Sequence, residues 1–103
     1  MFFVDSHLDL AMNALIWNRD LTRSVAQTRE LEAGIAGKGR AGGTVALPDM
    51  RRGGVGLCFA TVIARTSDNW REDGGLDASS QGIAFARAAG QLAYYRLLGR
   101  GGG

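Results

Sequence analysis

Near its start the chain reads Phe2-Phe3-Val4-Asp5-Ser6-His7-Leu8-Asp9-Leu10, an apolar run that leads to the sole histidine of the sequence. The run predicts a strand, and successive side chains of a strand point to opposite faces, so His7 and Asp9 would lie on the same side. An imidazole and a carboxylate on one side can bind one divalent cation such as Zn²⁺. A histidine that is only hydrogen-bonded at a strand end gives the same short pattern, so on these residues alone both interpretations stay open.

A second apolar run, Val55-Gly56-Leu57-Cys58-Phe59-Ala60-Thr61-Val62-Ile63-Ala64, is rich in β-branched and aromatic residues. It predicts a central strand covered on both faces, as in a parallel sheet wrapped by helices. Cys58 is expected to be largely buried and chemically inert. The long connection from the first run contains helical patterns, and parallel neighbours require such a crossover. We therefore expect the two strands to lie side by side and parallel.

The connection between these strands contains three segments with helical character. Residues 11–17 have an apolar face formed by Met12, Leu15 and Ile16. Residues 22–33 predict a surface helix whose outward residues are Arg23, Arg29, Glu30 and Glu32. Residues 44–54 predict a short helix with Pro48 in its first turn and Gly53 in a left-handed conformation at its end. The glycines and basic residues of 34–43 match neither a P-loop nor a dinucleotide fingerprint, which favours a plain loop.

A polar loop is expected from Arg65 to Ala78, at the end of the second strand where parallel α/β folds carry function. Trp70 can cover a ligand there or shield the base of the loop, and both remain open. Asp77 or Ser79 is expected to cap a long helix that runs to about residue 98. Its apolar stripe comprises Ile83, Ala86, Ala89 or Gly90, and Ala93, with Phe85, Ala88, Leu92 and Tyr95 beside it.

Composition restricts the classes of partner. The 103 residues are 46% apolar and carry a net charge of +2 from 12 basic and 10 acidic side chains, as in a soluble single domain. This balance argues against nucleic acid or an anionic membrane as partner. The single cysteine cannot form an internal disulfide, and neither a signal peptide nor an apolar run of membrane-spanning length is apparent. A cytoplasmic location is expected.

Two blocks, Val4-Asp5-Ser6-His7-Leu8-Asp9-Leu10 and Leu47-Pro48-Asp49-Met50-Arg51-Arg52-Gly53-Gly54-Val55-Gly56-Leu57-Cys58-Phe59, carry a resemblance to a known family. Together they resemble the start of the membrane (renal) dipeptidase-like zinc peptidases, which are relatives of the amidohydrolases. The resemblance extends from Phe3 to about Arg96. Two blocks at the expected separation are more specific than His-x-Asp alone.

The resemblance implies an α/β fold in which this chain forms the first two strand–helix units of a (β/α)₈ TIM-type barrel, a fold of about 250 residues. Residues 1–98 would be the N-terminal part of the barrel and residues 99–103 a flexible glycine-rich tail. In the family, His-x-Asp binds one of two zinc ions, and His7 and Asp9 match it. The bridging glutamate and two further histidines would lie beyond Gly103, so no catalytic or other cofactor-binding residue is assigned within this chain. Asp5 is expected to be a structural polar residue.

The implied activity is hydrolysis of dipeptides by a water activated between two zinc ions, in a complete enzyme that can form a homodimer. With two ligands, this chain by itself is expected to bind zinc poorly, to be loosely packed and to be inactive. The alternative is a non-catalytic small α/β interaction or structural module.

Overall fold

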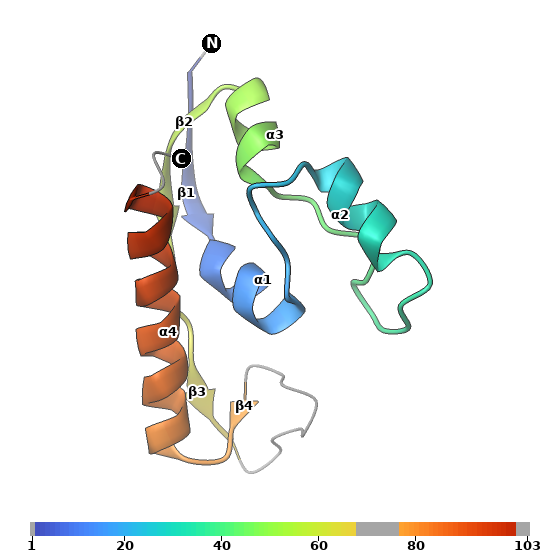
Figure 1. Cartoon of the computed structure of the whole chain (residues 1–103). Helices are drawn as coiled ribbons and strands as arrows, with labels where there is room; N and C mark the ends of the chain where they lie inside the picture. The colour runs from blue at the N-terminus through green and yellow to red at the C-terminus, as the bar shows by residue number, and fades with distance from the viewer. Residues whose placement is uncertain (1, 68–76, 101–103) are drawn as a thin grey trace.

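In the computed structural model the described residues are 2–67 and 77–100, and they form a small mixed α/β arrangement (Figure 1). The elements in chain order are β1 (Phe3–Leu8), α1 (Leu10–Trp17), α2 (Val25–Glu32), α3 (Leu47–Arg52), β2 (Val55–Ala60), β3 (Arg65–Thr66), β4 (Asp77–Ala78) and α4 (Gln81–Arg100). None of the described helices combines the length and the apolar content needed to span a bilayer.

The strands β1 and β2 are adjacent and parallel, which confirms the expected pairing. The register joins Phe3 to Val55 at one end and Leu8 to Ala60 at the other, with irregularities between. The pairing continues past the strand, because the backbone N–H of Thr61 donates to the carbonyl oxygen of Leu8 at 3.0 Å. The second strand nevertheless ends at Ala60 rather than at residue 64.

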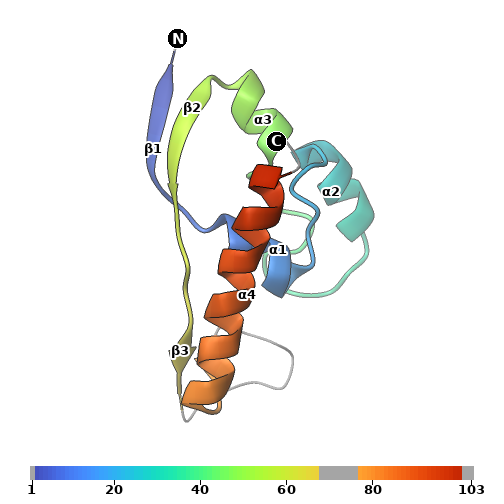
Figure 2. The ribbon, with the colours of Figure 1, turned by 60° about the vertical axis from the view of Figure 1, so that its left-hand side comes forward.

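The helices lie on one face of this two-stranded sheet (Figure 2). On that face Leu8 and Cys58 pack against a small core whose buried members are Leu10, Ala14 and Leu21. On the other face Leu57 and Phe59 are 51% and 59% exposed. The expectation of a strand covered on both faces is therefore wrong for the described residues, and Cys58 is half-buried rather than largely buried. The physical reason is that these residues supply a single layer of helices.

Helix α4 buries only part of the face that hydropathy predicts. Its half-buried and buried positions recur at helical spacing at Ala84, Ala88, Gln91, Tyr95 and Leu98. Of the expected residues, Ala88, Gly90 and Tyr95 are half-buried, whereas the others are exposed: Ile83, Phe85, Ala86, Ala89, Leu92 and Ala93. The helix is attached by hydrogen bonds as well as apolar contact, which is why its fully buried residue is a glutamine.

The ends of α4 also differ from expectation. The hydroxyl oxygen of Ser80, rather than of Asp77 or Ser79, accepts from the N–H of Ile83 at 3.2 Å and caps the first turn. The helix continues to Arg100, so Gly99 and Arg100 are helical and not part of a flexible tail. The expected polar loop begins and ends in a short parallel pair, β3 with β4. Trp70 lies outside the described residues.

Helix α2 begins with a capping box. The hydroxyl oxygen of Ser24 accepts from the N–H of Gln27 at 3.1 Å, and the Gln27 side chain accepts from the N–H of Ser24 at 3.0 Å. At the other end Glu32, expected to face outward, is buried instead. It forms a bidentate ion pair with Arg19 at 2.7 and 2.9 Å. This partner lies outside the helix, so helical periodicity alone does not reveal it.

Helix α3 has Pro48 in its first turn, as predicted. The prediction that Gly53 adopts the left-handed conformation is wrong. Gly53 has a right-handed φ of −77°, and the next residue, Gly54, is left-handed with φ of 83°. Asp49 in the first turn accepts from the N–H of Val25 at 2.8 Å and ties α3 to the start of α2. This hydrogen bond, with a further contribution from Arg52, lowers the pKa of the Asp49 carboxyl.

For helix α1, the buried positions are Leu10, Ala11 and Ala14. The predicted face of Met12, Leu15 and Ile16 is half-buried or exposed. The helix turns Leu10 and Ala14 toward the core, where they contact the residues from β1, β2 and α4.

Candidate metal site at the end of the first strand

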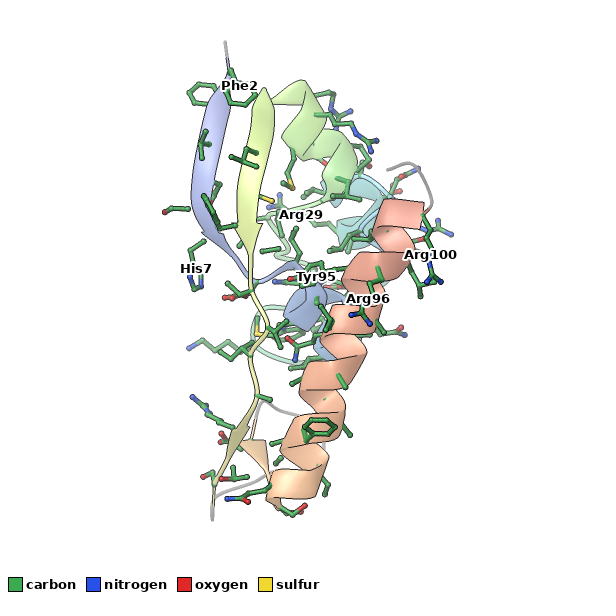
Figure 3. All side chains as sticks on the ribbon, turned by 90° about the vertical axis from the view of Figure 1, so that its left-hand side faces the viewer. Phe2, His7, Arg29, Tyr95, Arg96 and Arg100 are labelled. Carbon is green, nitrogen blue, oxygen red and sulfur yellow. The ribbon has the colours of Figure 1, made fainter. Side chains whose placement is uncertain are left out.

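His7 and Asp9 lie at the C-terminal end of β1, on either side of Leu8. Leu8 packs into the core, and His7 points away from α4 on the uncovered side (Figure 3). Asp9 follows the strand and precedes α1, with φ of −87° and ψ of 56°. The chain therefore bends at Asp9, and both the alternation of the strand and this bend bring the two side chains together.

The two side chains are in direct contact. His7 Nε2 lies 3.1 Å from Asp9 Oδ1, with side-chain exposures of 70% and 29%. A ring that is mostly exposed keeps access to solvent and to dissolved ions. A ring N–H at Nε2 can donate to the carboxylate oxygen across this distance.

Asp9 is held from two neighbouring elements. Its carbonyl oxygen accepts from the backbone N–H of Asn13 at 3.1 Å and from the Asn13 side chain at 2.9 Å. Its carboxylate Oδ1 accepts from the hydroxyl of Thr61, which directly follows β2. Sequence reasoning did not single out Thr61. The signal was available in the parallel register, because the residue after Ala60 must lie beside the residue after Leu8.

Asp5 is oriented along the strand. Its Oδ1 accepts from the backbone N–H of His7 at 2.9 Å, across two residues. This contact supports the extended conformation of β1 just before the histidine. The Asp5 carboxylate thus makes a local backbone contact within β1, and its structural role stays a prediction.

The donor atoms of His7 and Asp9 fit two positions around a zinc ion. Zinc binds imidazole nitrogen and carboxylate oxygen at about 2.0–2.1 Å in tetrahedral geometry, which places two ligands about 3.3 Å apart. The observed separation of 3.1 Å is close to this value. Within residues 2–67 and 77–100, no group of three or more His, Cys, Asp or Glu side chains could hold a metal. Two donor atoms by themselves leave a tetrahedral ion two ligands short.

Comparison of the chain with protein-family models, with curated proteins and with solved structures gave no significant match.

Proposed function

We propose that this chain contributes one half of the metal site of a zinc-dependent, dipeptidase-like metallopeptidase, with His7 and Asp9 as metal ligands. The observation that carries the proposal is the 3.1 Å contact between imidazole and carboxylate at the C-terminal end of a strand in a parallel pair. In parallel α/β barrels, functional residues gather at that end of the strands.

The chemistry assigned to each residue is limited to what its atoms can do. His7 and Asp9 hold the cation through a ring nitrogen and a carboxylate oxygen. Asn13 and Thr61 hold Asp9 in place. Zinc in such a site supplies an activated water and polarises the scissile carbonyl of a dipeptide. The remaining ligands and the proton-transfer groups are not assigned within this chain, which is expected to be inactive alone.

The uncovered face of the sheet supports the barrel part of the proposal. Val4, Leu57 and Phe59 are 55%, 51% and 59% exposed on β1 and β2. Inward-facing strand residues of a (β/α)₈ barrel are apolar and are packed by side chains from the other strands. Further strand–helix units would cover these residues and bring the missing ligands. A cytoplasmic location and a homodimer of the complete enzyme belong to the same proposal.

The second candidate is a non-catalytic α/β interaction or structural module. The same exposed residues, Leu57 and Phe59, favour it as a binding surface. The two candidates differ in metal binding, because an interaction module does not require a cation between His7 and Asp9.

Zinc titration of the 103-residue chain tests the proposal. Calorimetry should detect weak binding that His7→Ala and Asp9→Asn abolish, and Co²⁺ in place of zinc should give a visible absorption band that His7→Ala removes. Asp5→Asn is the matched control, since it neutralises a carboxylate on the same strand while keeping the oxygen that accepts from His7. Equal zinc affinity in the wild type and in His7→Ala would reject the proposed site.

A further inference from the structure

We propose that Thr61 is the positioning residue of the candidate metal site, because its hydroxyl fixes the rotation of the Asp9 carboxylate. The link to metal binding rests on the proposed function. The evidence for the inference is the set of hydrogen bonds that Thr61 makes.

Thr61 has two donors, and both point to the end of β1. Its backbone N–H donates to the carbonyl oxygen of Leu8 at 3.0 Å, which places the residue in register. Its hydroxyl lies 3.4 Å from the same carbonyl and much closer to Asp9 Oδ1. A hydroxyl has one proton, and a carboxylate is the stronger acceptor, so the proton goes to Asp9.

This hydrogen bond acts on the oxygen that faces the histidine. Oδ1 of Asp9 receives the hydroxyl of Thr61 and also contacts the ring of His7. A hydrogen bond to a carboxylate oxygen restricts the rotation of the carboxylate, and outer hydrogen bonds of this kind orient metal ligands.

Thr61 is itself held by α4. The hydroxyl of Tyr95 donates to the carbonyl oxygen of Thr61 at 2.6 Å and accepts from the N–H of Ala11 at 3.0 Å. Two residues further along, the Gln91 side chain pairs with both the N–H and the carbonyl of Ile63, at 2.8 and 2.6 Å. The segment after β2 is therefore attached to the helix at two points. These contacts hold the backbone of Thr61 in place, and with it the start of the Thr61 side chain.

The test compares variants at one position. Thr61→Val removes the hydroxyl and keeps the shape, Thr61→Ala removes it in a smaller side chain, and Thr61→Ser keeps it. All three retain the backbone hydrogen bond to Leu8. Zinc affinity is measured by calorimetry on the whole chain, in buffer with sucrose, which favours the compact state. Loss of an outer hydrogen bond should weaken binding about 10- to 100-fold in the valine and alanine variants, with the serine variant close to wild type.

A second readout needs no metal. His7 is the sole histidine, so its ring ¹⁵N signals are unambiguous. When the Asp9 carboxylate is free to rotate, these signals should move toward those of an unpaired imidazole in Thr61→Val and Thr61→Ala and stay in place in Thr61→Ser. The amide ¹H–¹⁵N spectrum of each variant checks that the fold is kept.

The outcomes separate this inference from the proposed function. Loss of affinity in Thr61→Val and Thr61→Ala with recovery in Thr61→Ser supports it. Wild-type affinity in all three variants, or equal loss in all three, overturns it. If zinc binding proves independent of His7, the proposed function fails, and the ring signals decide the inference alone: signals that are unchanged in Thr61→Val and Thr61→Ala overturn it.

Discussion

Removing the charge of Glu32 should detach helix α2 and the following segment from helix α1. The carboxylate is buried at 5% exposure, accepts from Arg19 at 2.7 and 2.9 Å and accepts from the N–H of Ala41 at 2.9 Å. Hydrogen bonding from Arg19 is the main cause that lowers its pKa from 4.5 to about 2, against the opposing effect of burial. The Ala41 N–H and the charges of Arg19 and Arg40 add to the lowering.

The size of the effect follows from this pKa. Each unit of difference between folded and unfolded states corresponds to about 1.4 kcal/mol, so a fall from 4.5 to about 2 is worth about 3 kcal/mol. Because the folded pKa is the lower one, this stability is fully present above pH 4.5 and is lost as the pH falls toward 2. Glu32→Gln should remove a similar amount at pH 7, in line with about 3–5 kcal/mol for breaking a buried ion pair.

Trp17 is a natural reporter for this perturbation. The guanidinium carbons of Arg19 and Arg40 lie 5.0 and 4.9 Å from its ring centroid, and Arg40 also donates to its carbonyl oxygen at 2.7 Å. In a Trp70→Phe background Trp17 is the sole tryptophan. Its emission, followed through a urea titration, should show a much lower midpoint for Glu32→Gln.

The matched control is Glu30→Gln, the same charge change at an exposed position of the same helix. It should leave the urea midpoint nearly unchanged. The reasoning is refuted if the two variants unfold alike, or if wild-type Trp17 emission does not change between pH 4.5 and 2.

Three further predictions concern α4, the uncovered sheet face and catalysis. Tyr95→Phe leaves the N–H of fully buried Ala11 and the carbonyl of Thr61 without their hydrogen-bond partner. The free energy of unfolding should fall by about 1–3 kcal/mol, and amide hydrogen exchange at Ala11 should become faster. Exchange of Ala11 at the wild-type rate would contradict this prediction. The isolated chain should bind an apolar dye through Leu57 and Phe59 and melt over a broad range, with dye binding reduced by a Leu57→Lys, Phe59→Lys double variant. Dipeptide turnover with added zinc should not exceed that of His7→Ala; a sharp transition together with greater turnover would argue for a complete active site.

The features that the sequence predicts correctly depend on local pattern. The parallel pairing of β1 with β2 follows from two apolar runs joined by a helical crossover, and Pro48 marks the first turn of α3. The proximity of His7 and Asp9 likewise depends on residues two apart.

The features that sequence reasoning missed depend on distant polar partners. Glu32 is buried because Arg19 reaches it from beyond the end of α1, and Gln91 is buried because it meets the backbone of Ile63. Hydropathy assigns both side chains to the surface, since it contains no information on which partner will satisfy them. The same limit concealed Thr61, whose role appears when the strands are placed in register.

The pairing of Gln91 with Ile63 gives an extended segment, from a helix, the hydrogen bonds that a neighbouring strand normally provides. A primary amide offers the donor and the acceptor of a peptide group, so Gln91 gives Ile63 the two hydrogen bonds that a neighbouring strand would otherwise give. The extended segment after β2 thus finds its lateral partner in α4. Carboxylates lack the donor, aliphatic side chains lack both groups, and asparagine is one methylene shorter. Position 91 therefore has a more restricted choice of residue than its place in an alanine-rich helix would suggest.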